Sequence, residues 1–194
     1  MPRSVFVVPE TAFAPATVPV PVQGEATVPL ASFIRPFQRH YFSGLPERPN
    51  YRARSYDFAG LPALMPLVRA FLDTCAATET NDYRYLFTLL GSELANNALR
   101  HSLSGLPGGN YTLRVRRDRE GLRLACRDRG GLRTRNTRLI PAPDGLNLGA
   151  ESGRGLAMVD ALATTWGDNG NAEYRTVWLY LAYDLTGSGW HSHN

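Results

Sequence analysis

The sequence predicts an α+β two-layer sandwich, in which helices cover one face of a mixed, mostly antiparallel β-sheet. Two observations support this fold class. From Tyr51 onward, stretches with an apolar period of two alternate with stretches of helical period. Their order is strand–helix–helix–strand–strand–helix–strand, and the two adjacent strands are close enough to form a hairpin. With 194 residues, the chain is long enough for one full domain and a tail.

The residues before this domain have a different composition. Residues 1–50 are rich in proline and show no sustained period, so we expect a disordered extension. Within it, residues 28–42 are mildly apolar and could dock on the domain or on a partner. We expect the folded domain over residues 51–185, and a frayed polar tail over residues 186–194.

The first half of the domain is predicted to contain one strand and two helices. Residues 51–58 alternate between polar and apolar and indicate a strand. Residues 61–77 have helical spacing, and Pro66 predicts that this helix begins late. A second helix is expected over residues 82–101, with a length of roughly 30 Å at about 1.5 Å per residue.

The second half is predicted to contain a hairpin, a helix and a last strand. The hairpin joins strands over residues 111–117 and 121–128. Residues 130–152 lack a clear period, and a loop of this length inside a domain is often a functional lid. A third helix is expected over residues 155–166. The last strand, over residues 173–183, is apolar on both faces and is therefore expected to be central.

The basic residues limit the phosphate chemistry open to this chain. All 21 are arginine, which excludes a Walker A loop and a eukaryotic-type protein kinase, because each needs a lysine at the phosphates. Ten arginines lie between Arg114 and Arg138, a density also found in nucleic-acid-binding proteins. However, Arg114 and Arg116 alternate with apolar residues and so line the outer face of a strand, and no aromatic residues interleave with them for base stacking. We therefore do not expect nucleic-acid binding.

The cysteines and the hydropathy pattern indicate the cellular compartment. Cys75 and Cys126 each lie in an apolar pattern, and we interpret them as buried free thiols, with a disulfide between them as the alternative. No apolar run approaches the roughly 18–20 residues needed to cross a bilayer, and the N-terminal residues do not resemble a secretory signal. We therefore expect a cytoplasmic protein without a membrane segment.

The most informative segment is the end of the second predicted helix. Glu93 and Asn97 lie one turn apart, on a side that begins apolar and should face the sheet. A carboxylate there is costly to bury unless it has a purpose. We interpret Glu93 as a residue that orients or deprotonates an attacking group. The Asn97 amide oxygen suits Mg²⁺, which prefers oxygen ligands and keeps several waters. The alternative is that Glu93 lies at the edge of the apolar stripe and reaches water.

A second acidic residue follows the hairpin. The period of two places Asp128 at the end of a core-facing row in its strand. An ionised carboxylate only accepts hydrogen bonds, which suits an exocyclic amino group such as that of adenine. Gly130 and Gly131 lack side chains and let the backbone approach a flat ring closely. The alternative is that Asp128 lies beyond the strand end and is solvated.

Two further features lie downstream. The third predicted helix opens with Gly153, Arg154, Gly155 and Leu156. Unpaired amides at a helix N-terminus attract phosphate, and glycines leave room for it, although a flexible cap is the alternative. Arg154 could contact phosphate or point toward a partner. Thr176 adds a hydroxyl to the last strand, where threonine is common.

Together, in this order, these segments resemble the N, G1, G2 and G3 boxes of the GHKL ATP-binding family. Within that family, the chain is most similar to the small anti-sigma-factor serine/threonine kinases and related bacterial regulatory ATPases. The resemblance covers residues 52–183 and rests on Ser92, Glu93, Leu94, Asn97, Ala98, His101 and Ser102. It also rests on residues 153–163 with the following Trp166 and Gly167, and on Thr176, Val177 and Trp178.

The resemblance implies a Bergerat-type fold that binds ATP and Mg²⁺. It implies that Glu93 is the general base, Asn97 the Mg²⁺ ligand and Asp128 the adenine anchor. Gly130 would shape the base pocket, and Thr176 would support Asp128 or the adenine through water. The remaining cofactor-binding residues would lie around the phosphates, namely Gly153, Arg154, Gly155 and Leu156.

The lid and the partners are also expectations from the resemblance. Residues 132–151 would form the ATP lid, but Leu132 stands where the family usually has the second glycine of the G1 box. The resemblance implies a protein serine/threonine kinase that phosphorylates an anti-anti-sigma partner. The alternative is a module that uses ATP only to set its shape while it binds a sigma factor or similar regulator. Homodimers are frequent among proteins that this chain resembles.

Overall fold

The computed structural model describes residues 34–42, 51–131, 138–141 and 154–190. Its centre is a five-stranded sheet in the order β1-β2-β3-β5-β4, and all four pairings are antiparallel. The strands are β1 (Ala53–Ala59), β2 (Asn110–Arg117), β3 (Gly121–Arg127), β4 (Thr165–Asp168) and β5 (Thr176–Ala182).

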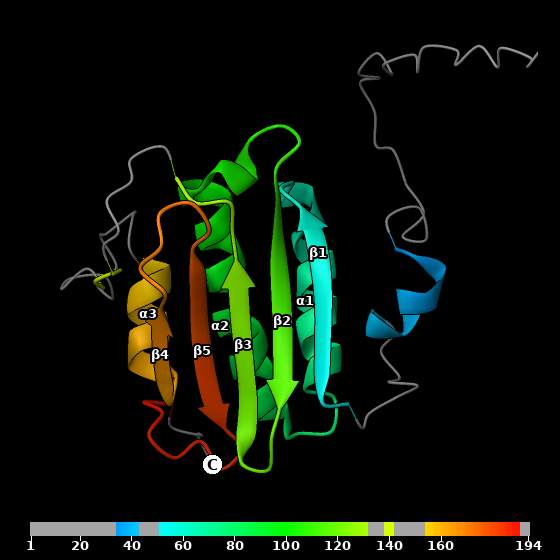
Figure 1. Cartoon of the computed structure of the whole chain (residues 1–194). Helices are drawn as coiled ribbons and strands as arrows, with labels where there is room; N and C mark the ends of the chain where they lie inside the picture. The colour runs from blue at the N-terminus through cyan, green and yellow to red at the C-terminus, as the bar shows by residue number, and fades with distance from the viewer. Residues whose placement is uncertain (1–33, 43–50, 132–137, 142–153, 191–194) are drawn as a thin grey trace, which may run out of the picture.

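Three α-helices lie behind this sheet and leave its front face open (Figure 1). They are α1 (Met65–Cys75), α2 (Asn81–His101) and α3 (Arg154–Leu162). Short 3-10 helices occur as η2 (Pro36–Tyr41), η3 (Pro62–Leu64) and η4 (Leu103–Gly105). The α+β two-layer sandwich is therefore confirmed, with a sheet that is antiparallel throughout the described residues rather than mixed.

The helix boundaries follow from local sequence. Pro66 lies in the first turn of α1, where its missing N–H is no loss, and the residues before it form η3 instead. The Thr80 side chain caps α2 by accepting a hydrogen bond from the Tyr83 amide. With 21 residues, α2 spans about 31 Å and passes behind the length of the sheet.

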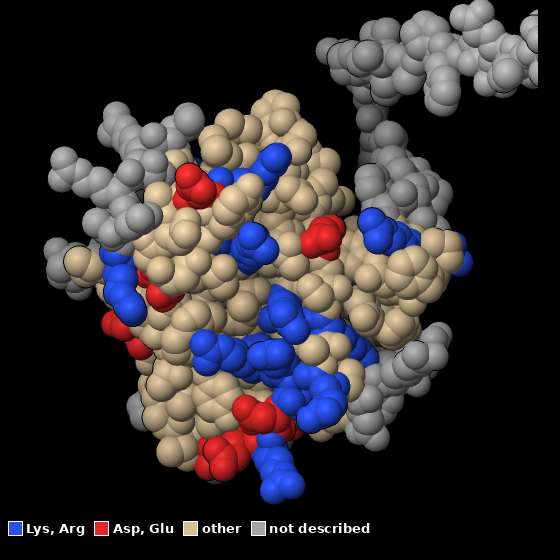
Figure 2. Space-filling model, in the orientation of Figure 1, with Lys and Arg blue, Asp and Glu red and all other residues tan. Residues whose placement is uncertain are grey.

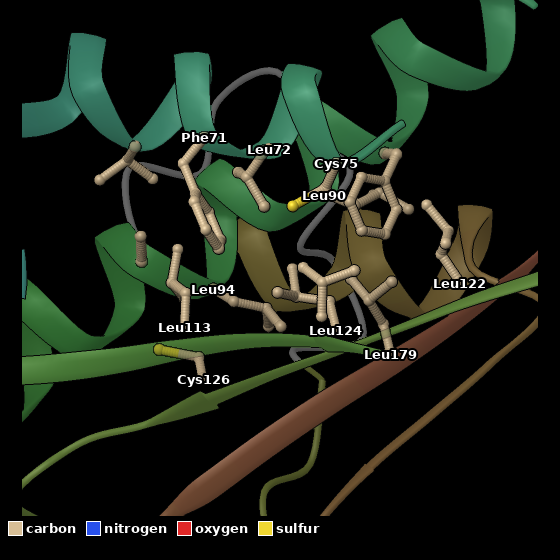
Figure 3. Packing of buried hydrophobic residues seen from close by; sticks show 14 of the residues in the cluster. Phe71, Leu72, Cys75, Leu90, Leu94, Leu113, Leu122, Leu124, Cys126 and Leu179 are labelled. Atoms are coloured by element: carbon tan, nitrogen blue, oxygen red, sulfur yellow. The ribbon is translucent and has the colours of Figure 1, made fainter. Parts of the chain in front are cut away.

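The core lies between the helices and the inner face of the sheet. Leu72 of α1 and Leu90 and Leu94 of α2 face leucines from β2, β3 and β5, as Figure 3 shows. These side chains are almost fully buried, and each such burial contributes about 1.5–3 kcal/mol. The core thus fixes the rotation of α2 about its axis, and with it the direction of the residues next to the leucine stripe.

The predicted third helix is too long at its C-terminus. It ends at Leu162, and Trp166 lies in β4, whose Thr165 pairs with Tyr180 of β5. The β-branched Thr164 and Thr165 favour extended backbone over helix. The Trp166 side chain still contacts the helix, because its Nε1 donates to Asp160 Oδ1 at 2.7 Å. Since β4 covers its edge, β5 is an inner strand, as predicted.

Described residues from both predicted terminal extensions pack on the domain. Phe42 is buried, and its ring contacts the rings of Tyr56, Phe58 and Phe71. At the other end, Ser188 Oγ donates to the Leu162 carbonyl, which differs from the frayed tail expected there. The prediction of a disordered extension over residues 1–33 and 43–50 lies outside the described residues.

The cysteines are free, and both are buried as predicted. Burial raises the pKa of the Cys75 thiol to about 12 and also raises that of Cys126. Both thiols are thus protonated near neutral pH and belong to the core. No helix among the described residues has the length and apolar character required to cross a membrane.

Candidate functional site

The α2 helix presents Glu93 and Asn97 beside its buried stripe. Both are half-buried, whereas Leu90 and Leu94 beside them are in the core. Glu93 therefore lies at the edge of the stripe, as in the alternative reading of the sequence. The edge position leaves its carboxylate accessible, which a group that exchanges a proton requires.

The Glu93 carboxylate lies against the start of α3. A Cβ atom added to Gly155 would lie 2.5 Å from Glu93 Oε2, so the two residues are in close contact only because position 155 is glycine. The α3 helix packs against α2, which brings its N-terminal end to this carboxylate. An anionic side chain and the N-terminal end of a helix, which favours phosphate binding in general, are thus neighbours.

Asp128 lies immediately after β3 and is buried. Its Oδ1 accepts a hydrogen bond from the Gly130 amide at 2.7 Å, and its own amide donates to the Arg175 carbonyl. No described donor is bonded to its second carboxylate oxygen. Burial raises the pKa of Asp128, and the Gly130 amide and the Arg175 charge oppose that rise in part. An uncommitted oxygen on a buried carboxylate is suited to bind an amino group of a ligand.

Gly130 has to be glycine. Its φ is +66°, and an added Cβ would lie 2.0 Å from the Ala172 carbonyl oxygen. Its carbonyl accepts a hydrogen bond from the Leu103 amide at 2.6 Å, and the next residue, Gly131, donates to Ala172. The turn after β3 is thereby fixed between η4 and the loop before β5.

These residues meet around a cavity of about 290 Å³. Asn97 and Asp128 line it together with Gly130, so α2 and the end of β3 form opposite parts of one pocket. Gly131, expected beside a flat ring, also lines it, as do His101 and Ser102 of the helix motif. Residues that the sequence interpretation did not assign to the site complete the lining, namely Arg138, Leu139, Ala172 and Arg175.

Thr176 does not line this pocket. It pairs with Arg127 in the sheet, and the alternating burial of β5 places it on the open face, opposite to the buried Val177. Asp128 instead lies across from Arg175, which lines the pocket and lies 4.0 Å from Asp168. The register thus places the preceding residue, Arg175, in the pocket lining, and the role expected for Thr176 through water stays a prediction.

The remaining predicted residues lie at the phosphate end. Arg154 is exposed at the start of α3, and Leu156 packs against the core from a half-buried position. Gly153, Leu132 and most of the expected lid lie outside the described residues. Of the predicted set, the described structure thus brings together Glu93 with Gly155, and Asn97 with Asp128 and Gly130.

Glu93 also borders a second cavity, of about 500 Å³, between α1 and α2. Most of its lining surface is apolar, but Arg69, Asp73 and Arg84 bring both charges to it, and Tyr85 also lines it. Arg84 and Asp73 form an ion pair across it at 2.7 Å. This α1–α2 groove shares no lining residue with the Asp128 pocket.

Among the described residues, no three His, Cys, Asp or Glu side chains come together as a metal site. A cation here would need Asn97 together with oxygens of a bound ligand, the arrangement in which Mg²⁺ binds nucleotide phosphates.

Comparison with known families agrees with this geometry. A family model described as the histidine kinase-like ATPase domain matches residues 58–180, from β1 to β5. A comparison with curated proteins gives no significant match. The matched segment contains α2, the β3 turn and the start of α3, which together form the site. The chain therefore belongs to the histidine kinase-like ATPase domain family.

Proposed function

We propose that this ATP-binding protein is a regulatory kinase, which phosphorylates a serine or threonine of an anti-anti-sigma-type protein and has a sigma factor as a further partner. The observation that carries the proposal is the placement of two functional groups by one helix. Asn97 of α2 lines the pocket of Asp128, and Glu93, one turn earlier, contacts Gly155 at the start of α3. A nucleotide with its base at Asp128 and its phosphates at α3 would follow α2 between them.

The residues in the site fit ATP. Asp128 would accept from the adenine amino group, and the close backbone approach at Gly130 would leave room for the ring. The amides at the start of α3 would hold phosphate, and the Asn97 oxygen would ligate Mg²⁺. When bound, ATP supplies the transferable phosphoryl group and Mg²⁺ neutralises its charge. In a chain without lysine, arginines supply the cations along this path, with Arg154 at the start of α3 and Arg138 and Arg175 in the lining of the base pocket.

Glu93 would take the proton of the acceptor hydroxyl. Its carboxylate contacts Gly155, and Glu93 also lines the α1–α2 groove, which shares no lining residue with the Asp128 pocket. An acceptor would therefore enter through the groove without crossing the base pocket. A general base has to lie within hydrogen-bond reach of the proton that it removes. The groove, with Arg69 and Tyr85 along it, offers this approach to a protein loop.

The test is incubation of the full chain with γ-labelled ATP and small anti-anti-sigma proteins as acceptors. We expect wild type to label an acceptor, and Glu93→Gln to bind ATP normally but transfer at least about 100-fold more slowly, the usual contribution of a general base. Glu120→Gln, in the exposed β2–β3 turn, removes the same charge away from the site and should transfer normally. Undiminished transfer by Glu93→Gln would disprove the role of this carboxylate.

The alternative is an ATP-dependent binding module without turnover. Leu132, in place of a glycine in the G1 box, favours it, because a Cβ there restricts the backbone that leads into the expected lid. In that case ATP binds, a sigma factor is retained only with ATP present, and no acceptor is labelled by wild type. Restoration of transfer by Leu132→Gly would show that this residue is the cause.

A further inference from the structure

The open face of the sheet carries a cluster of arginines that the nucleotide site does not use. Four exposed arginines point outward from the two middle strands β2 and β3, namely Arg114, Arg116, Arg123 and Arg127; we call this the arginine face. Figure 2 shows basic side chains gathered over the middle of the sheet, with acidic side chains at the lower end of the cluster. The helices lie on the other side of the sheet (Figure 1), and among them α2 lines the Asp128 pocket with Asn97 and His101.

The charges on the arginine face are uncompensated within the described residues. None of the four arginines forms an ion pair there, whereas Arg84 and Arg117 elsewhere pair with Asp73 and Glu79. Arg116 and Arg123 are directly opposite one another in the β2–β3 register. Like charges in that position destabilise a sheet, so a ligand that brings negative charge relieves a repulsion present in the free protein.

Aromatic rings hold two of the guanidinium groups in place. Arg123 stacks on Trp178 of β5 with its Cζ 3.7 Å from the ring centroid, and Arg127 lies over Tyr174 at 5.0 Å. A stacked guanidinium keeps its N–H edge free for bidentate bonds to a carboxylate or phosphate. The face is therefore ordered before any anion arrives, which lowers the entropy lost on binding.

This arrangement favours carboxylates of a protein over nucleic acid. Base stacking needs a free ring face, but the guanidinium of Arg123 covers one face of Trp178, and that of Arg127 lies over Tyr174. The cluster extends only about 14 Å along β3, at about 3.4 Å per residue. Asp57 lies on the same face in the row of Arg127, and Asp118 follows the strand end near Arg116. A basic patch of this length, with acidic residues at its ends, does not offer the continuous row of positive charges that binds a phosphate backbone.

We propose that the arginine face docks an acidic surface of a partner protein. A second copy of the chain is disfavoured, because face-to-face pairing would bring the same four positive charges together. The inference rests on the proposed function only in taking the partner to be a protein, and it requires neither ATP binding nor turnover.

The test compares two variants of the full chain with equal charge. Arg116→Gln with Arg123→Gln removes two charges from the arginine face, whereas Arg39→Gln with Arg52→Gln removes two exposed charges from outside it. Fluorescein-labelled poly-L-glutamate serves as the carboxylate probe and oligo-dT of equal charge as the nucleic-acid probe, both followed by anisotropy. ATP affinity is measured in parallel by calorimetry, so that damage to the nucleotide site is distinguished from loss of the arginine face.

We expect the Arg116/Arg123 variant to bind poly-L-glutamate about 10-fold more weakly, which corresponds to the loss of one good charge pair. The Arg39/Arg52 variant should change less than about 2-fold, and ATP affinity should be unchanged in both. Thermal unfolding checks that the Arg116/Arg123 variant is folded, and removal of the like-charge pair should leave it at least as stable.

Three outcomes would contradict the proposal. If both variants bind poly-L-glutamate equally weakly, net charge alone explains the binding. Tighter binding of oligo-dT through the same arginines would assign the face to nucleic acid, and dissociation of a wild-type dimer in the Arg116/Arg123 variant would assign it to a second copy.

Discussion

Asp128→Asn tests the assignment of the base pocket most directly. In the structure, one carboxylate oxygen of Asp128 is bonded to the Gly130 amide at 2.7 Å, which leaves the other oxygen for a ligand. Asparagine has an oxygen at only one of the two positions that the carboxylate oxygens occupy, so the position that faces either Gly130 or the adenine amino group becomes a donor. A hydrogen bond to a charged group contributes about 1.5–3 kcal/mol. We therefore expect ATP affinity to fall about 10- to 150-fold.

The assay is calorimetric titration with ATP and with inosine triphosphate, which carries an acceptor oxygen in place of the adenine amino group. Wild type should prefer ATP, whereas the amide N–H₂ of Asp128→Asn should bind that oxygen and reduce or reverse the preference. Asp57→Asn is the matched control, because Asp57 is exposed and accepts a hydrogen bond from Thr112 outside the pocket. An unchanged ATP affinity and an unchanged ratio in Asp128→Asn would refute the adenine assignment.

The same variant should not lower the stability of the ligand-free protein. Burial raises the pKa of Asp128 above its ordinary value of 3.8, so the folded state favours the protonated form. The ionised carboxylate therefore opposes folding, and this cost appears as the pH rises through the raised pKa. Asp128→Asn has no carboxyl group that titrates. The difference in melting temperature between this variant and wild type should therefore increase from pH 4 to pH 7. A variant that melts well below wild type at pH 7 would show that the ionised carboxylate does not oppose folding.

Three further predictions concern other parts of the structure. Gly155→Ala should fold normally, because the added Cβ meets only the mobile end of Glu93, 2.5 Å away, but it should displace that carboxylate and slow transfer in the labelling assay. Asn97→Ala should bind ATP like wild type in EDTA, yet lose the tightening by Mg²⁺, at least about 10-fold, since even outer-shell partners of a metal contribute that much. Phe42→Ala should lower the free energy of unfolding in urea by about 3 kcal/mol, because its ring is buried among core aromatic rings, while Phe37→Ala, 69% exposed, should change it little.

The elements of the domain were predictable because their signals are local. The apolar spacing of α2 places Glu93 beside the leucine stripe, and the period of two in β3 turns Asp128 inward, as found. The late start of α1 follows from Pro66 alone. In each case the residue type and its immediate neighbours determine the structure, so no knowledge of distant contacts was needed.

The parts that were missed depend on contacts between distant segments. Four residues of β4 carry too weak a pattern to be recognised, and only pairing with β5 makes them a strand. The presence of Arg175 in the pocket lining follows from the β3–β5 register, because a shift of one residue would turn its side chain to the other face of the sheet. The stacking of Arg123 on Trp178 likewise joins residues that are far apart in the sequence.

The two proposed binding regions meet at the ends of β3 and β5. Arg127 belongs to the arginine face and Asp128, the next residue, to the nucleotide pocket, while Thr176 and Arg175 repeat the same alternation in the paired strand. A protein docked on Arg127 would therefore act on the backbone that positions Asp128, the proposed adenine anchor. If such docking shifts ATP affinity by some factor, thermodynamic linkage requires ATP to shift docking by the same factor. The ratio of the poly-L-glutamate affinities measured with and without ATP gives that factor. The Arg127→Gln variant, which leaves the pocket intact, should bring this ratio closer to one.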